Sequence, residues 1–202
     1  RLTQPVAAEG LVVLASIDRG TVYALDRKTG RKAWQFLAGG RIDSPPALYQ
    51  GLAIFGCADG SVYCLSLSDG TLVWRFTAAR SDLRTVSYDQ VESLWPVHGS
   101  VLVLNGVAYF GAGRSTWLDG GIDLYALDPG TGRLLHTARH ASRHPKINEG
   151  KSRAGKGHVR KVAQNLSDYK THLQPDRSDS FSMAGGARSD VLVSDGTNVF
   201  LR

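Results

Sequence analysis

The segment Gly20–Phe36, GTVYALDRKTGRKAWQF, returns forty residues later as Gly60–Phe76, GSVYCLSLSDGTLVWRF. A third copy occupies Gly121–His136 and reads GIDLYALDPGTGRLLH. Neither set of alternate residues in VYAL or VYCL is polar, which indicates strands covered on both faces. A period of about forty residues with strands of this kind is typical of stacked β-sheet units rather than of helical repeats.

A second hairpin precedes each copy. Each has a two-residue turn that ends in glycine, followed by an apolar strand such as Leu11–Ala15 or Leu52–Gly56. Turns of this length need positive φ, which glycine and, less readily, amide or acidic residues adopt. The turns are Glu9-Gly10, Gln50-Gly51 and Asn105-Gly106. Each unit is therefore predicted to contain four short strands.

The predicted fold class is all-β, built from four-stranded antiparallel blades of a β-propeller. Blades are expected at residues 4–37, 42–77 and 98–138, and a fourth begins within 189–202, where Val191–Phe200 aligns with Val101–Phe110. About three and a half blades do not close a ring, which takes at least about four. The chain is therefore expected to be a fragment, completed by other blades of the same protein or by another chain.

One motif carries a family resemblance. The pattern Ala-x-Asp-x-x-Thr-Gly-x-x-x-Trp resembles the tryptophan-docking motif of the pyrroloquinoline-quinone-type (PQQ-like) propeller repeat. It is complete in the first copy, whereas the second copy has Cys64, Ser66 and Asp69 in place of motif residues and the third has His136 at the Trp position. The matching residues are Ala24, Asp26, Thr29, Gly30, Trp34, Gly70, Trp74, Ala126, Asp128, Thr131 and Gly132.

This resemblance implies that each docking Trp packs on the neighbouring blade and that the blades close into a ring. It also implies a bacterial protein of the periplasm or cell envelope. The pattern resembles the propeller lipoproteins of outer-membrane barrel assembly more than the quinoprotein dehydrogenases. No apolar run approaches the eighteen or so residues of a membrane-spanning helix.

Unequal connections distinguish the two ends of the predicted blades. In an up-and-down blade, the first and third turns lie at one end, and the second turn and the link to the next blade lie at the other. Only short turns fall at the first end, while the segments 77–98, 113–120 and 137–189 fall at the second. Long connections in compact domains often carry function. We therefore take the second end, the long-loop face, as the candidate functional face.

Two entries into blades place polar groups on that face. Trp95 and His98 lead into the first strand of the third blade, and Arg41 and Asp43 lead into the second. Because the first strand of a blade is expected to be innermost, these side chains are candidates to border the central funnel. The structural alternative is a Trp that caps its blade and a His bonded to backbone.

A third candidate group is the loop 114–119, which offers Arg114, Trp117 and Asp119. A cation, an aromatic face and a carboxylate within six residues suit planar or sugar-like ligands. The alternative is an ordinary exposed turn with one packed Trp.

The net charge of +6 comes from one segment. Residues 139–170 contain nine Lys or Arg against Glu149 and Asp168, a net of 9 − 2 = +7, which leaves −1 for the rest. Residues 139–188 are therefore predicted to be a basic, flexible insertion. It is a candidate for binding polyanions, although nucleic acid is not expected because Tyr169 is the only Phe, Tyr or Trp among residues 139–170. The cations considered are Arg153, Lys156, Arg160 and Lys161.

Catalytic and metal-binding patterns are not evident in the sequence. No nucleophile, base and orienting group occur at diagnostic spacing, and no metal site is predicted. If Ala58 pairs with Ser61, Cys57 faces Val62, and Cys64 is a diagonal neighbour too distant for a disulfide. Both cysteines are therefore expected to be buried free thiols.

The leading hypothesis is a non-enzymatic scaffold or binding domain whose long-loop face recognises a protein or ligand, with no cofactor. The resemblance also implies an alternative, a fragment of a PQQ-dependent alcohol or sugar dehydrogenase with the quinone and Ca²⁺ over the funnel. Against it, the adjacent-cysteine ring of those enzymes is missing, and no cluster of acidic and amide ligands for Ca²⁺ is evident. Polyanion binding by the basic insertion is a second alternative.

Overall fold

The computed structural model describes residues 1–116, 118–141 and 191–200, and the regular elements of these residues are β-strands. They include no helix long and apolar enough to cross a membrane. Three antiparallel sheets of four strands each form within this part of the chain, with the strands in chain order. The predicted all-β fold of four-stranded blades is thus confirmed.

Each blade is built from four consecutive strands. Blade 1 contains β1 (Val6–Ala8), β2 (Leu11–Ser16), β3 (Thr21–Asp26) and β4 (Lys32–Leu37). Blade 2 contains β5 (Ala47–Tyr49), β6 (Leu52–Gly56), β7 (Ser61–Ser66) and β8 (Leu72–Thr77). Blade 3 contains β11 (Leu102–Leu104), β12 (Val107–Ala112), β13 (Ile122–Leu127) and β14 (Leu134–His140). A further hairpin pairs β15 (Val193–Ser194) with β16 (Val199–Phe200).

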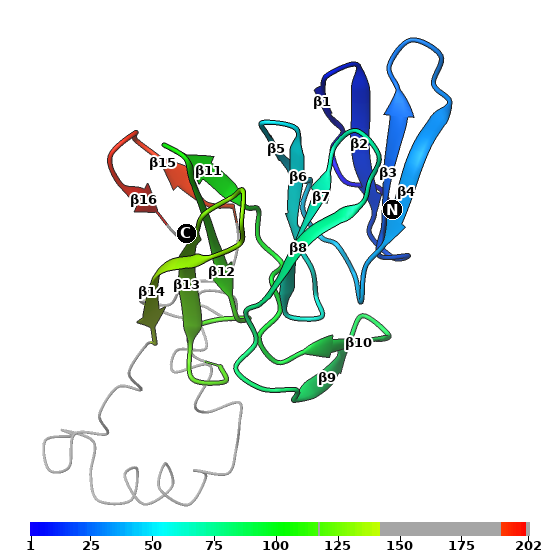
Figure 1. Cartoon of the computed structure of the whole chain (residues 1–202). Helices are drawn as coiled ribbons and strands as arrows, with labels where there is room; N and C mark the ends of the chain where they lie inside the picture. The colour runs from blue at the N-terminus through cyan, green and yellow to red at the C-terminus, as the bar shows by residue number, and fades with distance from the viewer. Residues whose placement is uncertain (117, 142–190, 201–202) are drawn as a thin grey trace, which may run out of the picture.

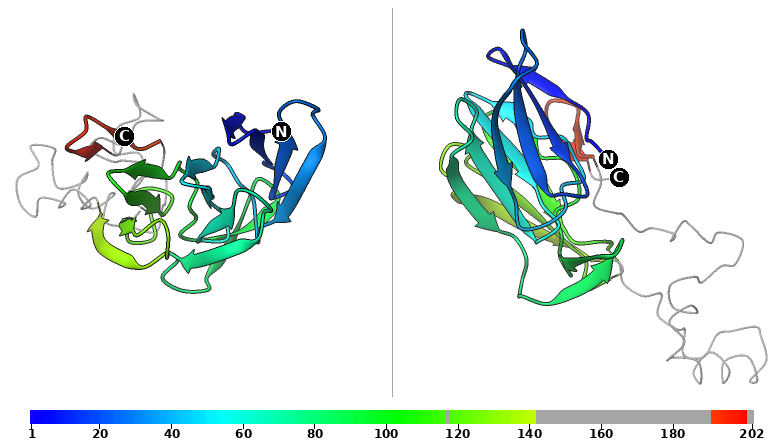
Figure 2. Two further views of the ribbon diagram at one scale, coloured as in Figure 1. Left: turned by 45° about the horizontal axis from the view of Figure 1, so that its top comes forward. Right: turned by 90° about the vertical axis from the view of Figure 1, so that its right-hand side faces the viewer.

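The blades follow one another along an arc (Figure 1; Figure 2, left). The first strands are neighbours across blades, β1 with β5 and β5 with β11, so they lie along the inner side of the arc. Both residues of each predicted two-residue turn adopt positive φ, as in Asn105 at 50° and Gly106 at 75°. The glycine-containing turns therefore set the short connections as the sequence predicts.

Neighbouring blades are joined through their fourth strands. The indole Nε1 of Trp34 donates to the carbonyl of Leu67 in blade 2 at 2.8 Å, and that of Trp74 donates to the carbonyl of Pro129 in blade 3 at 2.9 Å. The turn that receives the indole is itself held by side chains. In blade 3, Asp128 Oδ1 accepts hydrogen bonds from the backbone N–H of Thr131 at 2.9 Å and from its hydroxyl at 3.0 Å.

Two apolar cores lie between the blades, each with three aromatic rings in the same arrangement. Between blades 1 and 2, Tyr63 stacks on Phe55 with ring centroids 5.5 Å apart and meets Phe36 edge-on at 5.8 Å. Between blades 2 and 3, Tyr125 stacks on Phe110 and meets Phe76 edge-on. Such pairs add about 0.5–1.5 kcal/mol beyond their buried area.

The cysteine-containing hairpin differs from its prediction by one residue. Val62 pairs with Gly56, not Cys57, and the Cys57 N–H donates to the Ser61 carbonyl across a three-residue turn. Gly60, at φ 85°, supplies the left-handed residue that a turn of this length uses. Both thiols are free and buried, and burial raises the pKa of Cys64 to about 12.

A hairpin that the sequence did not predict follows blade 2. Its strands β9 (Arg84–Ser87) and β10 (Gln90–Ser93) pair in register across a turn at Tyr88 and Asp89. Both turn residues have positive φ, 50° and 59°, although neither is glycine. Residues 84–93 are called the strap below.

Candidate functional site

The strap lies across the long-loop face (Figure 1). At its base, the Ser93 N–H donates to the carbonyl of Ala58 in the β6–β7 turn at 2.8 Å. At its tip, the side-chain amide of Gln90 donates to the carbonyl of Asp18 in the β2–β3 turn at 2.9 Å. The strap therefore leaves blade 2 and reaches back to blade 1.

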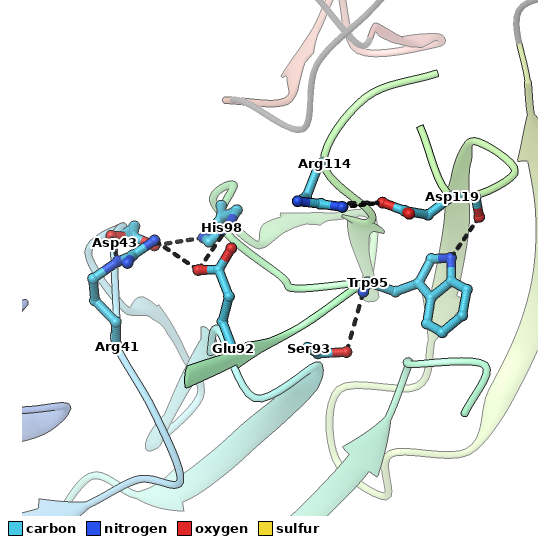
Figure 3. A network of polar contacts seen from close by, with 8 residues as sticks. All are labelled: Arg41, Asp43, Glu92, Ser93, Trp95, His98, Arg114 and Asp119. Atoms are coloured by element: carbon cyan, nitrogen blue, oxygen red, sulfur yellow. Dashed lines mark hydrogen bonds and ion pairs between the residues drawn. The ribbon is translucent and has the colours of Figure 1, made fainter. Parts of the chain in front are cut away.

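Beneath the strap, Arg41 connects two carboxylates (Figure 3). Its Nε donates to Asp43 Oδ1 at 2.7 Å, and its Nη2 donates to Glu92 Oε2 at 3.1 Å. Arg41 and Asp43 come from the connection between blades 1 and 2, whereas Glu92 comes from β10 of the strap. The ion pairs thus tie the strap to the entry of blade 2.

His98, in the entry to blade 3, faces the same two carboxylates. Its Nδ1 lies 2.5 Å from Asp43 Oδ2, and its Nε2 lies 3.7 Å from Glu92 Oε2. Although burial opposes the shift, the contacts with both carboxylates raise the pKa of His98 above its usual value. Burial likewise opposes the change at Asp43, yet the contacts with His98 and Arg41 lower its pKa. The two carboxylates therefore favour the protonated form of His98, with Nδ1 facing Asp43 and Nε2 facing Glu92.

One donor of this network is unsatisfied. Arg41 is 6% exposed, and its Nη1 is buried without a hydrogen-bond partner among the described residues. The Tyr88 ring lies over the guanidinium, with the guanidinium carbon 4.8 Å from the ring centroid.

A second cluster lies in blade 3 (Figure 3). Arg114 holds Asp119 Oδ2 through both Nε, at 3.0 Å, and Nη2, at 2.5 Å. The Asp119 carbonyl accepts from Trp95 Nε1 at 2.9 Å and from Arg80 Nη1 at 3.0 Å. Trp95 is 8% exposed, and the Arg80 guanidinium lies 5.4 Å from its ring centroid. The indole of Trp95 is therefore packed against Arg80 and bonded to the Asp119 carbonyl.

A pocket with a cavity volume of about 590 Å³ opens between the strap and the blade entries. Its lining includes three arginines, four carboxylates and one histidine, so that the formal charges nearly cancel when His98 is protonated. The lining residues are Arg1, Ile17, Asp18, Arg41, Asp43, Ser87, Tyr88, Asp89, Glu92, His98 and Arg114.

The structure brings four of the sequence-derived candidates, Arg41, Asp43, His98 and Arg114, to the pocket, and places Asp119 beside Arg114. Sequence reasoning missed Glu92 and Tyr88 because it did not foresee the strap. Candidate Trp117 lies outside the described residues, as do residues 142–188 of the predicted basic insertion with Arg153, Lys156, Arg160 and Lys161.

Four carboxylates of this face are already paired with arginine. Asp43 and Glu92 bind Arg41, Asp119 binds Arg114, and Asp123 binds both Arg80 and Arg139. Within residues 1–116, 118–141 and 191–200, no three His, Cys, Asp or Glu side chains are grouped to hold a metal ion.

Comparison with known proteins identifies the repeat. Residues 1–115 and 58–165 match a protein family described as outer membrane protein assembly factor BamB. BamB of Moranella endobia is 31% identical over 74 residues, covering 37% of this chain and 19% of the relative. The quinoprotein alcohol dehydrogenase PedH of Pseudomonas putida is 29% identical over 142 residues, covering 65% of this chain and 22% of the relative. The chain thus spans about a fifth of the length of these relatives.

Among solved structures, the quinohemoprotein alcohol dehydrogenase ADHIIG of Pseudomonas putida HK5 superposes with a TM-score of 0.56 at 20% identity. The match covers 79% of this chain and 23% of the enzyme. At this identity, the similarity establishes the propeller fold and no activity.

Proposed function

Because the chain belongs to the PQQ-like propeller family described as outer membrane protein assembly factor BamB, we propose that it is a non-enzymatic scaffold of the bacterial cell envelope. Its long-loop face would dock a protein of the outer-membrane assembly machinery. No cofactor is part of this proposal. Further blades, from the same protein or from another chain, would complete the ring.

The observation that carries the proposal is the outer face of the strap. Val86 and Val91 are directly paired and are 72% and 60% exposed. The neighbouring Leu83 is 58% exposed. Apolar side chains gathered on a projecting hairpin are typical of a surface that binds another protein.

Site-specific photo-crosslinking in cells tests the docking face. A photoreactive amino acid at Val86 is expected to capture an outer-membrane assembly protein. The matched control is Lys28, which is exposed in the β3–β4 turn at the opposite end of blade 1. A Val86→Asp, Val91→Asp double variant should lose the complex. Capture from Lys28 but not from Val86, or a complex that survives the double variant, contradicts the proposal.

A dehydrogenase is the second candidate function, favoured by the match to PedH across 65% of the chain. A quinone enzyme of this kind would need Ca²⁺, which takes six to eight oxygen ligands. Asp43, Glu92 and Asp119 of the long-loop face are instead paired with arginine or histidine. No three His, Cys, Asp or Glu side chains of the described residues are grouped to hold a metal ion, so these residues do not fit a Ca²⁺–quinone site.

Adding pyrroloquinoline quinone and Ca²⁺ to the purified protein separates the two functions. The scaffold proposal predicts that no quinone absorbance remains with the protein after desalting. If the protein retained one quinone chromophore per chain, the scaffold proposal would be wrong and the dehydrogenase would be the better-supported function.

A further inference from the structure

The pocket under the strap contains a hydrogen-bond donor that is already positioned. Asp43 and Glu92 hold the Arg41 guanidinium through Nε and Nη2, so its orientation is fixed before any ligand arrives. Its remaining nitrogen, Nη1, is buried and has no partner in the described part of the chain. Leaving a buried polar group unpaired is costly. An oxygen acceptor supplied by a ligand would remove that cost.

The charges around this donor select against a charged ligand. Arg41 and Arg114 are both engaged with carboxylates, and His98 lies between Asp43 and Glu92, which favour its positively charged form. An added carboxylate would lie close to Asp43 and Glu92, which remain ionised because the contacts with His98 and Arg41 outweigh the effect of burial and lower the pKa of both. Because the positive and negative charges around the pocket nearly cancel, the pocket favours a neutral ligand group that both accepts and donates hydrogen bonds.

Tyr88 adds a flat apolar surface. Its ring lies over the Arg41 guanidinium, and the residue is 80% exposed at the pocket mouth. Ser87 and Asp89 line the same mouth and provide a hydroxyl and a carboxylate. An aromatic surface surrounded by alternating donors and acceptors matches a sugar ring, which has apolar C–H faces and hydroxyls at its edge.

The two faces of the strap carry different side chains, one set facing the pocket and the other facing away from it. Successive residues of a strand project to opposite sides, and in β10 Val91 is exposed whereas Glu92 is 2% exposed and joins Arg41. The pocket side is therefore distinct from the Val86–Val91 surface proposed for protein docking.

We propose that the pocket under the strap binds a neutral saccharide of mono- or disaccharide size, with Arg41 Nη1 donating to a sugar oxygen and Tyr88 supporting the ring. The cavity of about 590 Å³ lies within the range of small-molecule sites, about 300–1,000 Å³. A sugar hydroxyl that accepts from Arg41 donates its own hydrogen to a carboxylate of the lining, so both partners are satisfied.

Saturation-transfer NMR on the purified protein tests this site, with maltose, cellobiose and di-N-acetylchitobiose as probes and with acetate and citrate as charged comparators. At least one disaccharide is expected to bind at millimolar concentration, and the two anions are not. Tyr88→Ser and Arg41→Lys should each weaken binding about tenfold or more. Val86→Ser, on the outer face of the same hairpin, should leave it unchanged.

Three results would overturn the proposal: no transfer to any of the disaccharides, binding of acetate or citrate instead, or disaccharide binding that Tyr88→Ser leaves intact. Tyr88 is exposed, so its variant decides the question even if Arg41→Lys does not fold. No partner protein enters this experiment. Failure of the saccharide site therefore leaves the docking proposal standing, and the reverse also holds.

Discussion

Gly70 lies directly against the indole of Trp34, and Gly132 lies in the same way against Trp74. A Cβ added at Gly70 would lie 2.6 Å from Trp34 Cδ2, and one at Gly132 would lie 2.7 Å from Trp74 Cδ2. Both glycines also have positive φ, 74° and 70°. The motif therefore needs glycine at this position for two separate reasons, the backbone conformation and the close approach of the next blade.

Replacing Gly70 by alanine separates these reasons when it is compared with the equivalent glycine of blade 1. Gly30 has a similar φ of 69° but nothing within 4 Å of an added Cβ. Gly30→Ala should lower the free energy of unfolding by about 1–2 kcal/mol through backbone strain. Gly70→Ala should lower it by about 1–3 kcal/mol more, because the indole must move. Equal losses in urea unfolding would show that Trp34 does not require the close approach.

His98 should make the stability of the protein depend on pH. Its folded-state pKa lies above the ordinary value of 6.5 because Asp43 and Glu92 outweigh the effect of burial. The stabilisation is therefore complete below about pH 6.5 and is lost as the pH rises through the raised folded-state value. The difference in unfolding free energy between the wild type and His98→Gln should shrink as the pH rises over this range. Urea titrations that give a constant difference would contradict the network.

At the scale of elements, the blades could be predicted and the strap could not. The blade strands recur three times with glycine turns, so the strands recognised in one copy predict those of the next. Among the described residues the strap has no second copy, its turn uses Tyr88 and Asp89 instead of glycine, and its strands are four residues each.

The candidate site was accordingly foreseen in part. Unequal loop lengths placed Arg41, Asp43 and His98 on the same face, because strand direction alternates regularly. Their partner Glu92 was missed, since its position depends on how the strap folds back. The Cys57 register was wrong for a similar reason: the length of the turn, three residues instead of two, decides which residues face each other.

Docking between blades should depend on the Trp34 side chain. Trp34 is 8% exposed and bonds to the Leu67 carbonyl. Trp34→Ala is expected to cost about 3–5 kcal/mol, as for other large core truncations. Trp34→Phe, which keeps a ring and loses the hydrogen bond, should cost clearly less. Unchanged thermal and urea stability in the alanine variant would mean that the indole does not hold the blades together.

At the scale of the whole molecule, the net positive charge lies in one segment outside the predicted blades. Residues 139–170 carry +7, and the remaining residues sum to −1, so the blades themselves are nearly neutral. Any strong attraction to polyanions therefore belongs to the basic segment and not to the propeller surface.

Heparin binding provides the measurement for this separation. Affinity for immobilised heparin should fall steeply as salt rises, because cations on the protein release counterions from the polymer. Deleting residues 142–188 should abolish it, and changing Arg153, Lys156, Arg160 and Lys161 to glutamine should reduce the salt dependence. Retention that is insensitive to salt, or that survives the deletion, would reject the polyanion role.

The strap has a consequence for how the repeats fold. In a simple array each repeat contacts its immediate neighbours, so stability accumulates one interface at a time and the ends fray independently. The Gln90 side chain bonds to the carbonyl of Asp18, 72 residues earlier, and joins the link between blades 2 and 3 to blade 1. The same link bonds to blade 3, where Trp95 Nε1 donates to the Asp119 carbonyl. Since one segment contacts all three blades, they should unfold as one cooperative unit.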